Sequence, residues 1–208
     1  MKKYNTSQDK FEFIQNEEET NQLFEKIKNF GKISLYSISQ IIKEEDFIKI
    51  NGMIGGNNKF ILKYGAKRDT CNTEIFHQKC DNICGSIIIC KIEGGDIIGG
   101  YLTAKIEKKN IFVNDNKAFL FNLSKNIIKK NKKSYKNAIK FFSDSSNFIR
   151  FGSGCNVFTL CGDCLKTQKS IVETCSCEAN FDCQTHNLLN LSSASYFKVE
   201  NFELFQVI

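Results

Sequence analysis

The sequence predicts a mainly-β α+β fold, a two-sheet antiparallel β-sandwich flanked by short helices, on the strength of three observations. Beyond residue 43 the chain consists of short segments rich in β-branched and aromatic residues, which Gly, Asn, Asp and Lys separate, as is typical of strands. These segments do not alternate with long amphipathic helices, so a doubly wound parallel sheet is not expected. The 208 residues are 41% hydrophobic and 25% charged, which suits one domain with a real core.

Helical patterns are confined to the N-terminal part of the sequence. Residues 1–15 show no periodic pattern and are predicted to form a loose arm. Residues 16–44 are predicted to hold the N-terminal helices. The first of these has Asn16 as its cap, Glu19 at the capping-box position and a stripe of apolar residues behind them. A second, shorter helix is expected over residues 34–43, where a leucine and three isoleucines recur on one face.

The predicted domain covers residues 45–208 and consists mostly of strands. Residues 118–123 are nearly continuous in apolar side chains, as in a strand that is covered on both faces. The C-terminal segment 196–208 is expected to form a strand pair or one bulged strand. The full set of predicted strands is 59–64, 86–92, 96–106, 117–123, 138–142, 148–152, 156–160 and 196–208.

The positive charge of the chain comes almost entirely from lysine. The formal net charge is +6, yet Arg68 and Arg150 are its only arginines. Because base readout and bidentate phosphate binding favour arginine, no nucleic-acid partner is expected. The one strongly basic segment, residues 125–140, lacks an interleaved aromatic platform and is predicted to be a solvated hairpin or loop.

The sequence contains no segment with the features of a targeting signal or a membrane span. The start, MKKYNTSQDKFEF, is basic but has neither an apolar stretch nor a small-residue cleavage site. The longest apolar runs are far too short to cross a bilayer. We therefore expect a cytoplasmic protein without an integral membrane segment, in a compartment where disulfides seldom persist. A monomer is expected as well.

A cluster of cysteines near the C-terminus allows three interpretations. Cys161-x-x-Cys164 has the spacing of a zinc knuckle, for which Cys183-x-x-His186 could supply the second half. The same C-G-D-C motif resembles a redox dithiol, although such a motif normally begins a helix and this one follows a strand-like segment. The third interpretation is that these cysteines are small buried hydrophobic residues together with a few exposed thiols.

Motifs of hydrolytic or nucleotide-dependent enzymes are missing from the sequence. The chain has only two histidines, His77 and His186, and no G-x-S-x-G elbow. Its glycine-rich segments match neither a P-loop nor a dinucleotide fingerprint. We therefore expect no enzymatic activity and no cofactor.

A series of short motifs runs in a fixed order from about residue 59 to the C-terminus, and it resembles a known module. The residues that carry the resemblance are Asp69, Phe76, Cys80, Asp81, Gly99, Gly100, Phe119, Phe121, Phe151, Gly152, Gly154, Cys183, Thr185, Glu203 and Phe205. In order and spacing these motifs are similar to the TLDc domain, the module of the oxidation-resistance proteins. The resemblance implies a β-sandwich flanked by helices, with these residues in architectural roles.

The resemblance also implies a function. It suggests a non-enzymatic protein-interaction module linked to protection against oxidative stress, with the peripheral sector of the vacuolar proton pump as its partner. Cys80 and Cys183 lie where the family often carries a buried cysteine that binds no metal. The alternative function is therefore a thiol-redox or structural zinc module, whose only tidy four-thiolate set is Cys161, Cys164, Cys175 and Cys177.

Overall fold

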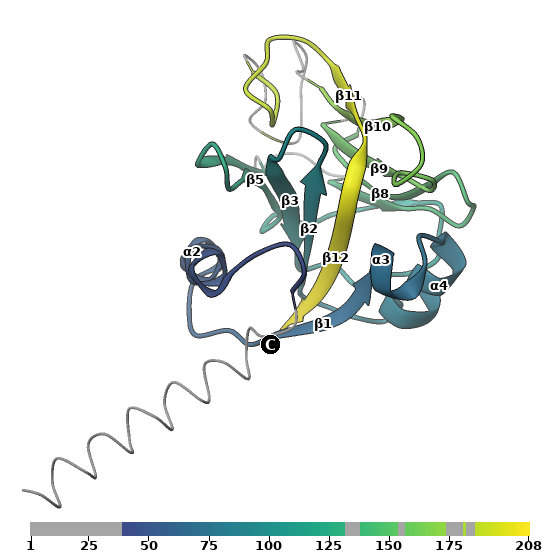
Figure 1. Cartoon of the computed structure of the whole chain (residues 1–208). Coiled ribbons are helices and arrows are strands. Elements are labelled where there is room, and N and C mark those ends of the chain that lie inside the picture. The colour runs from purple at the N-terminus through teal and green to yellow at the C-terminus, as the bar shows by residue number, and fades with distance from the viewer. Residues whose placement is uncertain (1–38, 132–137, 154–156, 174–180, 182–185) are drawn as a thin grey trace, which may run out of the picture. The chain divides into compact units, whose positions relative to one another are not determined.

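The computed structural model describes residues 39–131, 138–153, 157–173, 181 and 186–208, all within one compact unit, residues 38–208. The described residues form two antiparallel six-stranded sheets, which confirms the predicted fold class (Figure 1). In spatial order, sheet A contains β1 (Phe60–Gly65), β12 (Val199–Val207), β2 (Ser86–Ile92), β3 (Ile97–Leu102), β5 (Phe119–Asn122) and β6 (Ile127–Lys130). Sheet B contains β11 (Ser195–Phe197), β10 (Ser170–Val172), β9 (Phe158–Cys161), β8 (Asn147–Phe151), β7 (Ile139–Phe141) and β4 (Phe112–Val113).

The two sheets pack face to face around one hydrophobic core. Phe202 and Leu204, alternate residues of β12, both belong to this core. The ring of Phe202 meets that of Phe148 on β8, with ring centroids 4.8 Å apart, and Tyr64 of β1 packs against both rings. Edge-to-face and tilted aromatic contacts of this kind add to the burial of apolar area, so they hold the sheets together at this point.

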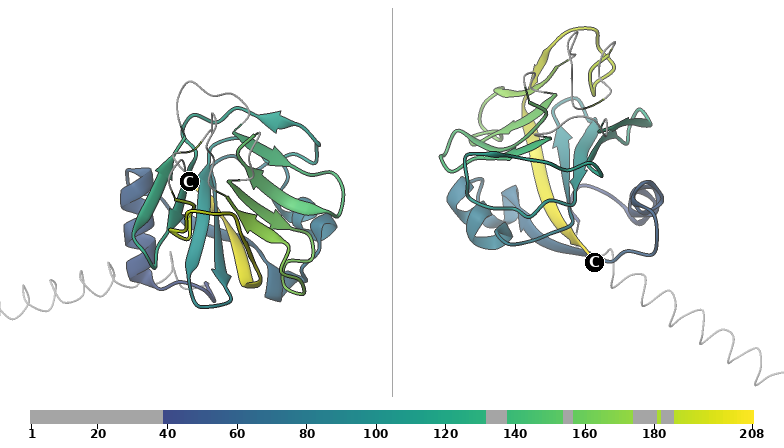
Figure 2. Two further views of the ribbon diagram at one scale, coloured as in Figure 1. Left: turned by 90° about the horizontal axis from the view of Figure 1, so that it is seen from above. Right: turned by 180° about the vertical axis from the view of Figure 1, so that it is seen from behind.

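Three short helices flank the described sheets. The helix α2 (Glu44–Ile54) covers the outer face of sheet A, where Phe47 lies edge-on to Phe205 at 5.2 Å between ring centroids. The helices α3 (Ala66–Asp69) and α4 (Thr73–Cys80) follow β1 and lie on the opposite side of the domain (Figure 2). The side chain of Asn72 caps α4 by accepting bonds from two backbone N–H groups of its first turn, at 2.8 and 3.2 Å.

The helix predicted over residues 34–43 does not extend through residues 39–43, which are not helical. Ser39 Oγ donates to Glu203 at 2.6 Å and accepts bonds from two backbone N–H groups, so it competes with helical hydrogen bonding. The first helix of the described residues, α2, begins at Glu44. The rest of the predicted N-terminal arm and helices, residues 1–38, lies outside the described residues.

Each predicted strand segment overlaps an observed strand, but the C-terminal segment differs from expectation. The C-terminal segment forms two strands in different sheets, β11 and β12, because the chain crosses from sheet B to sheet A at Lys198. The pairing of β12 with β2 is also irregular between Val199 and Asn201. The basic segment is predicted to be a solvated hairpin or loop, and its described start agrees with the hairpin, because β6 pairs antiparallel with β5 across the turn at residues 123–126 and forms the edge of sheet A. Residues 132–137 of this segment lie outside the described residues. Within the described ranges, no helix is both long and apolar enough to cross a membrane.

Candidate functional site

Two consecutive glycines of the family pattern make room for two phenylalanine rings on opposite faces of sheet A. A Cβ atom on Gly99 would lie 2.0 Å from the backbone carbonyl oxygen of Ile88 and 2.6 Å from the ring of Phe121, and one on Gly100 would lie 2.5 Å from the ring of Phe151. Both rings are completely buried. Successive residues of a strand face opposite sides, so one glycine admits a ring from within sheet A and the other a ring from sheet B.

Asp69 of the family pattern joins β1, α3 and α4. Its carboxylate accepts a hydrogen bond from the backbone N–H of Gly65 at 2.9 Å and pairs with Arg68 at 2.7 Å and Lys79 at 3.2 Å. Burial alone would raise the pKa of Asp69, but the hydrogen bonds from Arg68, Gly65 and Lys79 outweigh it and lower that pKa to about 2. The carboxylate is therefore a charged structural junction.

The other family-pattern residues of α4 and the turn that follows it also have structural contacts. Phe76 lies edge-on to Tyr64 at 5.3 Å between ring centroids. The buried His77 bonds Asp81 through Nδ1 and the Phe142 carbonyl through Nε2, both at 2.7 Å. Cys80 is completely buried, and burial raises its pKa to about 12. These contacts fasten α4 to β1 of sheet A and, through the Phe142 carbonyl, to the segment that follows β7 of sheet B.

Glu203 is a buried carboxylate that anchors the segment entering α2. It accepts hydrogen bonds from Ser39 Oγ at 2.6 Å and from the Gln40 backbone N–H at 2.8 Å. Burial raises its pKa, although these two hydrogen bonds and the charge of Arg68 oppose that change. The neighbouring family-pattern residue Phe205 supports Phe47 of α2, so both positions hold α2 against sheet A.

The loop before β11 presents apolar side chains to solvent from a fixed backbone. Asn187 is completely buried; its side chain accepts from the backbone N–H groups of Leu189 and Leu191 and donates to the Ser193 carbonyl. Leu191 itself is 47% exposed, and Tyr196 on the adjoining edge strand β11 is 63% exposed. We name residues 187–196 the β11 loop. No sequence motif marks this loop, because hydrogen bonds define it.

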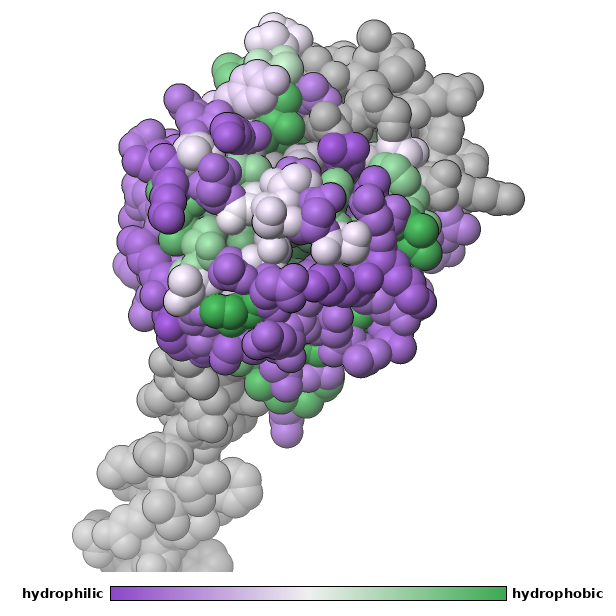
Figure 3. All heavy atoms as spheres, turned by 90° about the vertical axis from the view of Figure 1, so that its right-hand side faces the viewer, coloured by the Kyte–Doolittle hydropathy of each residue, from purple (hydrophilic) through white to green (hydrophobic). Residues whose placement is uncertain are grey.

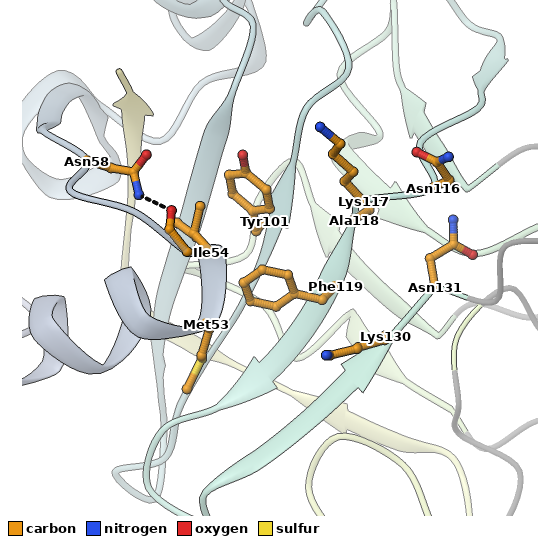
Figure 4. A pocket seen from close by; sticks show the side chains of 11 residues that line it. Met53, Ile54, Asn58, Tyr101, Asn116, Lys117, Ala118, Phe119, Lys130 and Asn131 are labelled. Carbon is orange, nitrogen blue, oxygen red and sulfur yellow. Dashed lines mark hydrogen bonds between the residues drawn. The ribbon is translucent and has the colours of Figure 1, made fainter.

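A pocket of about 440 Å³ lies between the end of α2 and sheet A (Figure 4). Asn131 is 7% exposed there; its amide donates to the Asp115 carbonyl at 2.5 Å, while its Oδ1 atom has no hydrogen-bond partner among the described residues. The lining combines polar and apolar side chains and includes two lysines. It is formed by Met53, Ile54, Gly55, Asn58, Tyr101, Asn116, Lys117, Ala118, Phe119, Lys130 and Asn131.

The cysteines of the C-G-D-C motif have different partners. Cys164 is completely buried, and its Sγ atom lies 3.7 Å from Sγ of Cys71, which comes from the turn between α3 and α4. The Sγ atom of Cys161 instead accepts from Ser170 Oγ at 3.4 Å and lies 3.4 Å from Asp163 Oδ1. Burial raises the pKa of Cys161. The pair that the structure brings together is thus Cys71 with Cys164.

The proposed four-thiolate set lies only partly within the described residues. Cys175 and Cys177 fall outside them, as do the family-pattern residues Gly154, Cys183 and Thr185. Among the residues that are described, no group of three or more His, Cys, Asp or Glu side chains is arranged to hold a metal ion. The four-thiolate set therefore stays a prediction. His186, the other possible ligand from the sequence, is exposed.

Comparison with known families agrees with the motif pattern and the sandwich. The family model of the TLDc domain matches residues 35–208, which is most of the chain. The match takes in part of the predicted N-terminal helical segment, whose boundary at residue 45 stays a prediction. No curated protein matches the sequence. The family match and the fold together place this chain in the TLDc domain family, the family of the oxidation-resistance proteins.

Proposed function

We propose that this TLDc domain is a cytoplasmic protein-binding module without enzymatic activity, and that its partner is the peripheral sector of the vacuolar proton pump. Through that contact it would contribute to protection against oxidative stress. Family membership supports the class of function. The β11 loop is the structural observation that carries the proposal.

The β11 loop has the properties of a preorganised binding surface. Leu191 and Tyr196 are exposed large side chains five positions apart. The strand β11, which carries Tyr196, lies at the end of the domain opposite the C-terminus (Figure 1). The backbone beneath them is held by Asn187, and the carbonyl of Leu188 accepts a hydrogen bond from Asn122 of β5 at 3.1 Å. A loop that is ordered before binding loses less conformational entropy when a partner covers it. Exposed aromatic side chains are frequent anchors of such interfaces.

The face of the domain that carries α3 and α4 presents fewer apolar side chains to a protein partner. On that face hydrophilic residues predominate, and the apolar areas are small and separate (Figure 3). A stable interface buries on the order of 1,200–2,000 Å² in total, so the β11 loop would act as the anchor of a wider polar contact.

The proposal is tested with the full chain and the purified peripheral sector of the pump. Replacing Leu191 and Tyr196 together by alanine should abolish binding or weaken it at least tenfold, since one hot-spot side chain is worth about 2 kcal/mol or more. The matched control replaces Ile48 and Ile111, which are 57% and 54% exposed elsewhere on the domain, and should leave binding unchanged. If the wild-type chain does not bind the pump, the partner is wrong. If both double variants bind equally, the β11 loop is not the contact.

A further inference from the structure

Cys71 and Cys164 form a close thiol pair between two turns that are far apart in the sequence. Cys71 lies in the turn between α3 and α4, and Cys164 lies in the turn that follows β9. Their sulfur atoms are 3.7 Å apart. A disulfide bond is about 2.05 Å long, so a small change in side-chain torsion angles would bring the two sulfurs within bonding distance.

The turn that carries Cys71 is fixed on both sides of the cysteine by one buried hydroxyl group. Tyr64 Oη donates to the carbonyl of Thr70 at 2.8 Å and accepts from the backbone N–H of Asn72 at 3.3 Å. Thr70 has a φ angle of 74°, which is rare for a β-branched residue and requires support from its surroundings. Cys71 therefore projects from a backbone whose conformation is held in place.

The turn that carries Cys164 is equally fixed. The Cys164 backbone N–H donates to the Cys161 carbonyl at 3.2 Å, and the Cys164 carbonyl accepts from the N–H of Val199 at 3.0 Å. At Gly162 a Cβ atom would lie 1.9 Å from the Ser145 carbonyl oxygen, so the turn is packed against its neighbour at that point. The thiol of Cys71 also lies 3.8 Å from the Gly162 carbonyl.

The two thiols differ in exposure and in acidity. Cys71 is partly exposed between the exposed residues Thr70 and Asn72, whereas Cys164 is completely buried. Hydrogen bonds from the Cys164 thiol and from the backbone N–H groups of Leu165 and Cys164 lower the pKa of Cys71, against burial and the charge of Asp163. The pKa of Cys164 is raised by its hydrogen bond to Cys71, by burial and by the Cys71 charge. Solvent therefore reaches the more acidic thiol.

We propose that Cys71 and Cys164 are a redox-modification site, at which a hydroperoxide converts two thiols into one intramolecular disulfide. The Cys71 sulfur attacks one oxygen of the peroxide and breaks the O–O bond, giving a sulfenic acid on Cys71 and releasing an alcohol, or water when the oxidant is hydrogen peroxide. The Cys164 sulfur then attacks the Cys71 sulfur and displaces the hydroxyl group, which leaves as water with the Cys164 proton. Two thiols are oxidised and one hydroperoxide is reduced.

The disulfide would covalently join two parts of the sandwich. Cys71 follows β1 and α3 at the edge of sheet A, and Cys164 follows β9 of sheet B. This site is separate from the β11 loop and does not depend on the proposed partner. It also differs from the C-G-D-C dithiol, because the partner of Cys164 comes from outside that motif.

The experiment uses the reduced full chain, treated with hydrogen peroxide while folded, then unfolded in the presence of an alkylating reagent so that the buried Cys164 can also react. Mass spectrometry then maps the disulfide-linked peptides. We expect the peptides containing Cys71 and Cys164 to be joined and both thiols to be lost from the alkylated pool. The exposed Cys84 serves as the internal control and should remain alkylatable. In a Cys164→Ala variant, a carbon nucleophile specific for sulfenic acids should label Cys71, because the resolving thiol is missing.

Two further variants separate the site from a general effect on folding. Cys84→Ala should leave the disulfide unchanged, and Cys71→Ala should leave Cys164 reduced after the same treatment. Thermal melts establish that each variant is folded, and the wild-type mapping does not depend on any variant. The proposal is overturned if Cys84 is oxidised while Cys71 stays reduced, or if Cys71 couples to another cysteine. It is also overturned if the purified chain carries one zinc ion whose removal is needed before either thiol reacts.

Discussion

Gly99 and Gly100 determine how closely aromatic rings approach both faces of β3. The space that their missing side chains leave is filled by Phe121 on one face and by Phe151 on the other. This close approach is a matter of volume rather than of backbone conformation, because neither glycine has a positive φ angle. The family pattern at these two positions therefore has a packing explanation.

Replacing Gly100 by alanine should destabilise the domain. The new methyl group would lie 2.5 Å from the buried ring of Phe151, so the ring must move within a close-packed core. We expect a loss of about 1–3 kcal/mol in the free energy of unfolding, measured by chemical denaturation. The matched control is Gly52→Ala in the exposed part of α2, where no atom lies within 4 Å of the new Cβ. It should stabilise by about 0.5–1 kcal/mol, and equal effects of the two changes would contradict the packing explanation.

Asp69→Asn should lower stability in a way that depends on pH. Three hydrogen-bonding groups hold the folded-state pKa of Asp69 at about 2, below the value near 3.9 of an unfolded chain. The charged carboxylate therefore stabilises the fold above pH 4, and this stabilisation is lost as the pH falls towards 2. We expect a loss of about 1.5–3 kcal/mol at pH 7 that shrinks in acid. Glu93→Gln, on a side chain that is 62% exposed, is the control, and a pH-independent loss would count against this account.

At the scale of elements, residue patterns predicted the strands that have enough consecutive strand-forming residues. The strand β2 contains four isoleucines in seven residues, and β12 contains two valines and two phenylalanines in nine. The strands β4 and β10 have two and three residues, too few for a periodic pattern to appear. The strand β6 is hidden among lysines, because pairing with β5 rather than its own composition creates it.

The helix α2 and the thiol pair show what local patterns could not predict. The sequence of α2 mixes isoleucines with an Asn-Gly pair, and its helix is stabilised by Phe47 and Ile50, both completely buried. The contact between Cys71 and Cys164 joins turns of different sheets, so no spacing in the sequence indicates it. The C-G-D-C motif instead suggested Cys161 as the partner of Cys164.

The strand β6 supplies a test of how charge contributes to partner binding. Lys129 and Lys130 lie on this edge strand, and Lys132 and Lys133 follow them in the sequence. Replacing all four by glutamine should slow association with the pump sector and weaken its salt dependence, because exposed charges mainly steer encounter. The complex should remain detectable by surface plasmon resonance.

The matched control for this charge change replaces four lysines elsewhere on the described surface, namely Lys49, Lys91, Lys169 and Lys198. It removes the same net charge but leaves β6 intact. A control that slows association as much as the β6 variant would show that only total charge matters. Complete loss of the complex in the β6 variant would show that these lysines anchor it.

At the scale of the whole molecule, the domain extends further towards the N-terminus than its strands suggest. The strands begin at Phe60, but the outer face of sheet A is covered by α2, and the segment before α2 is bonded to Glu203 of the inner strand β12. The family match likewise begins at residue 35. The sandwich therefore depends on residues that carry no strand pattern.

Chains shortened from the N-terminus should show this dependence as a graded loss of stability. A chain that begins at residue 39 keeps both hydrogen bonds to Glu203, whereas one that begins at residue 45 leaves a buried carboxylate without those two donors. We expect the second chain to lose about 1–3 kcal/mol relative to the first. A chain that begins at residue 55 also loses α2, and with it the burial of Phe47 and Ile50, each worth about 1.5–3 kcal/mol. Chemical denaturation of the three chains beside the full-length protein measures the order. If the chain that begins at residue 55 unfolded at the same denaturant concentration as the chain that begins at residue 39, α2 would be an accessory to the sandwich rather than part of it.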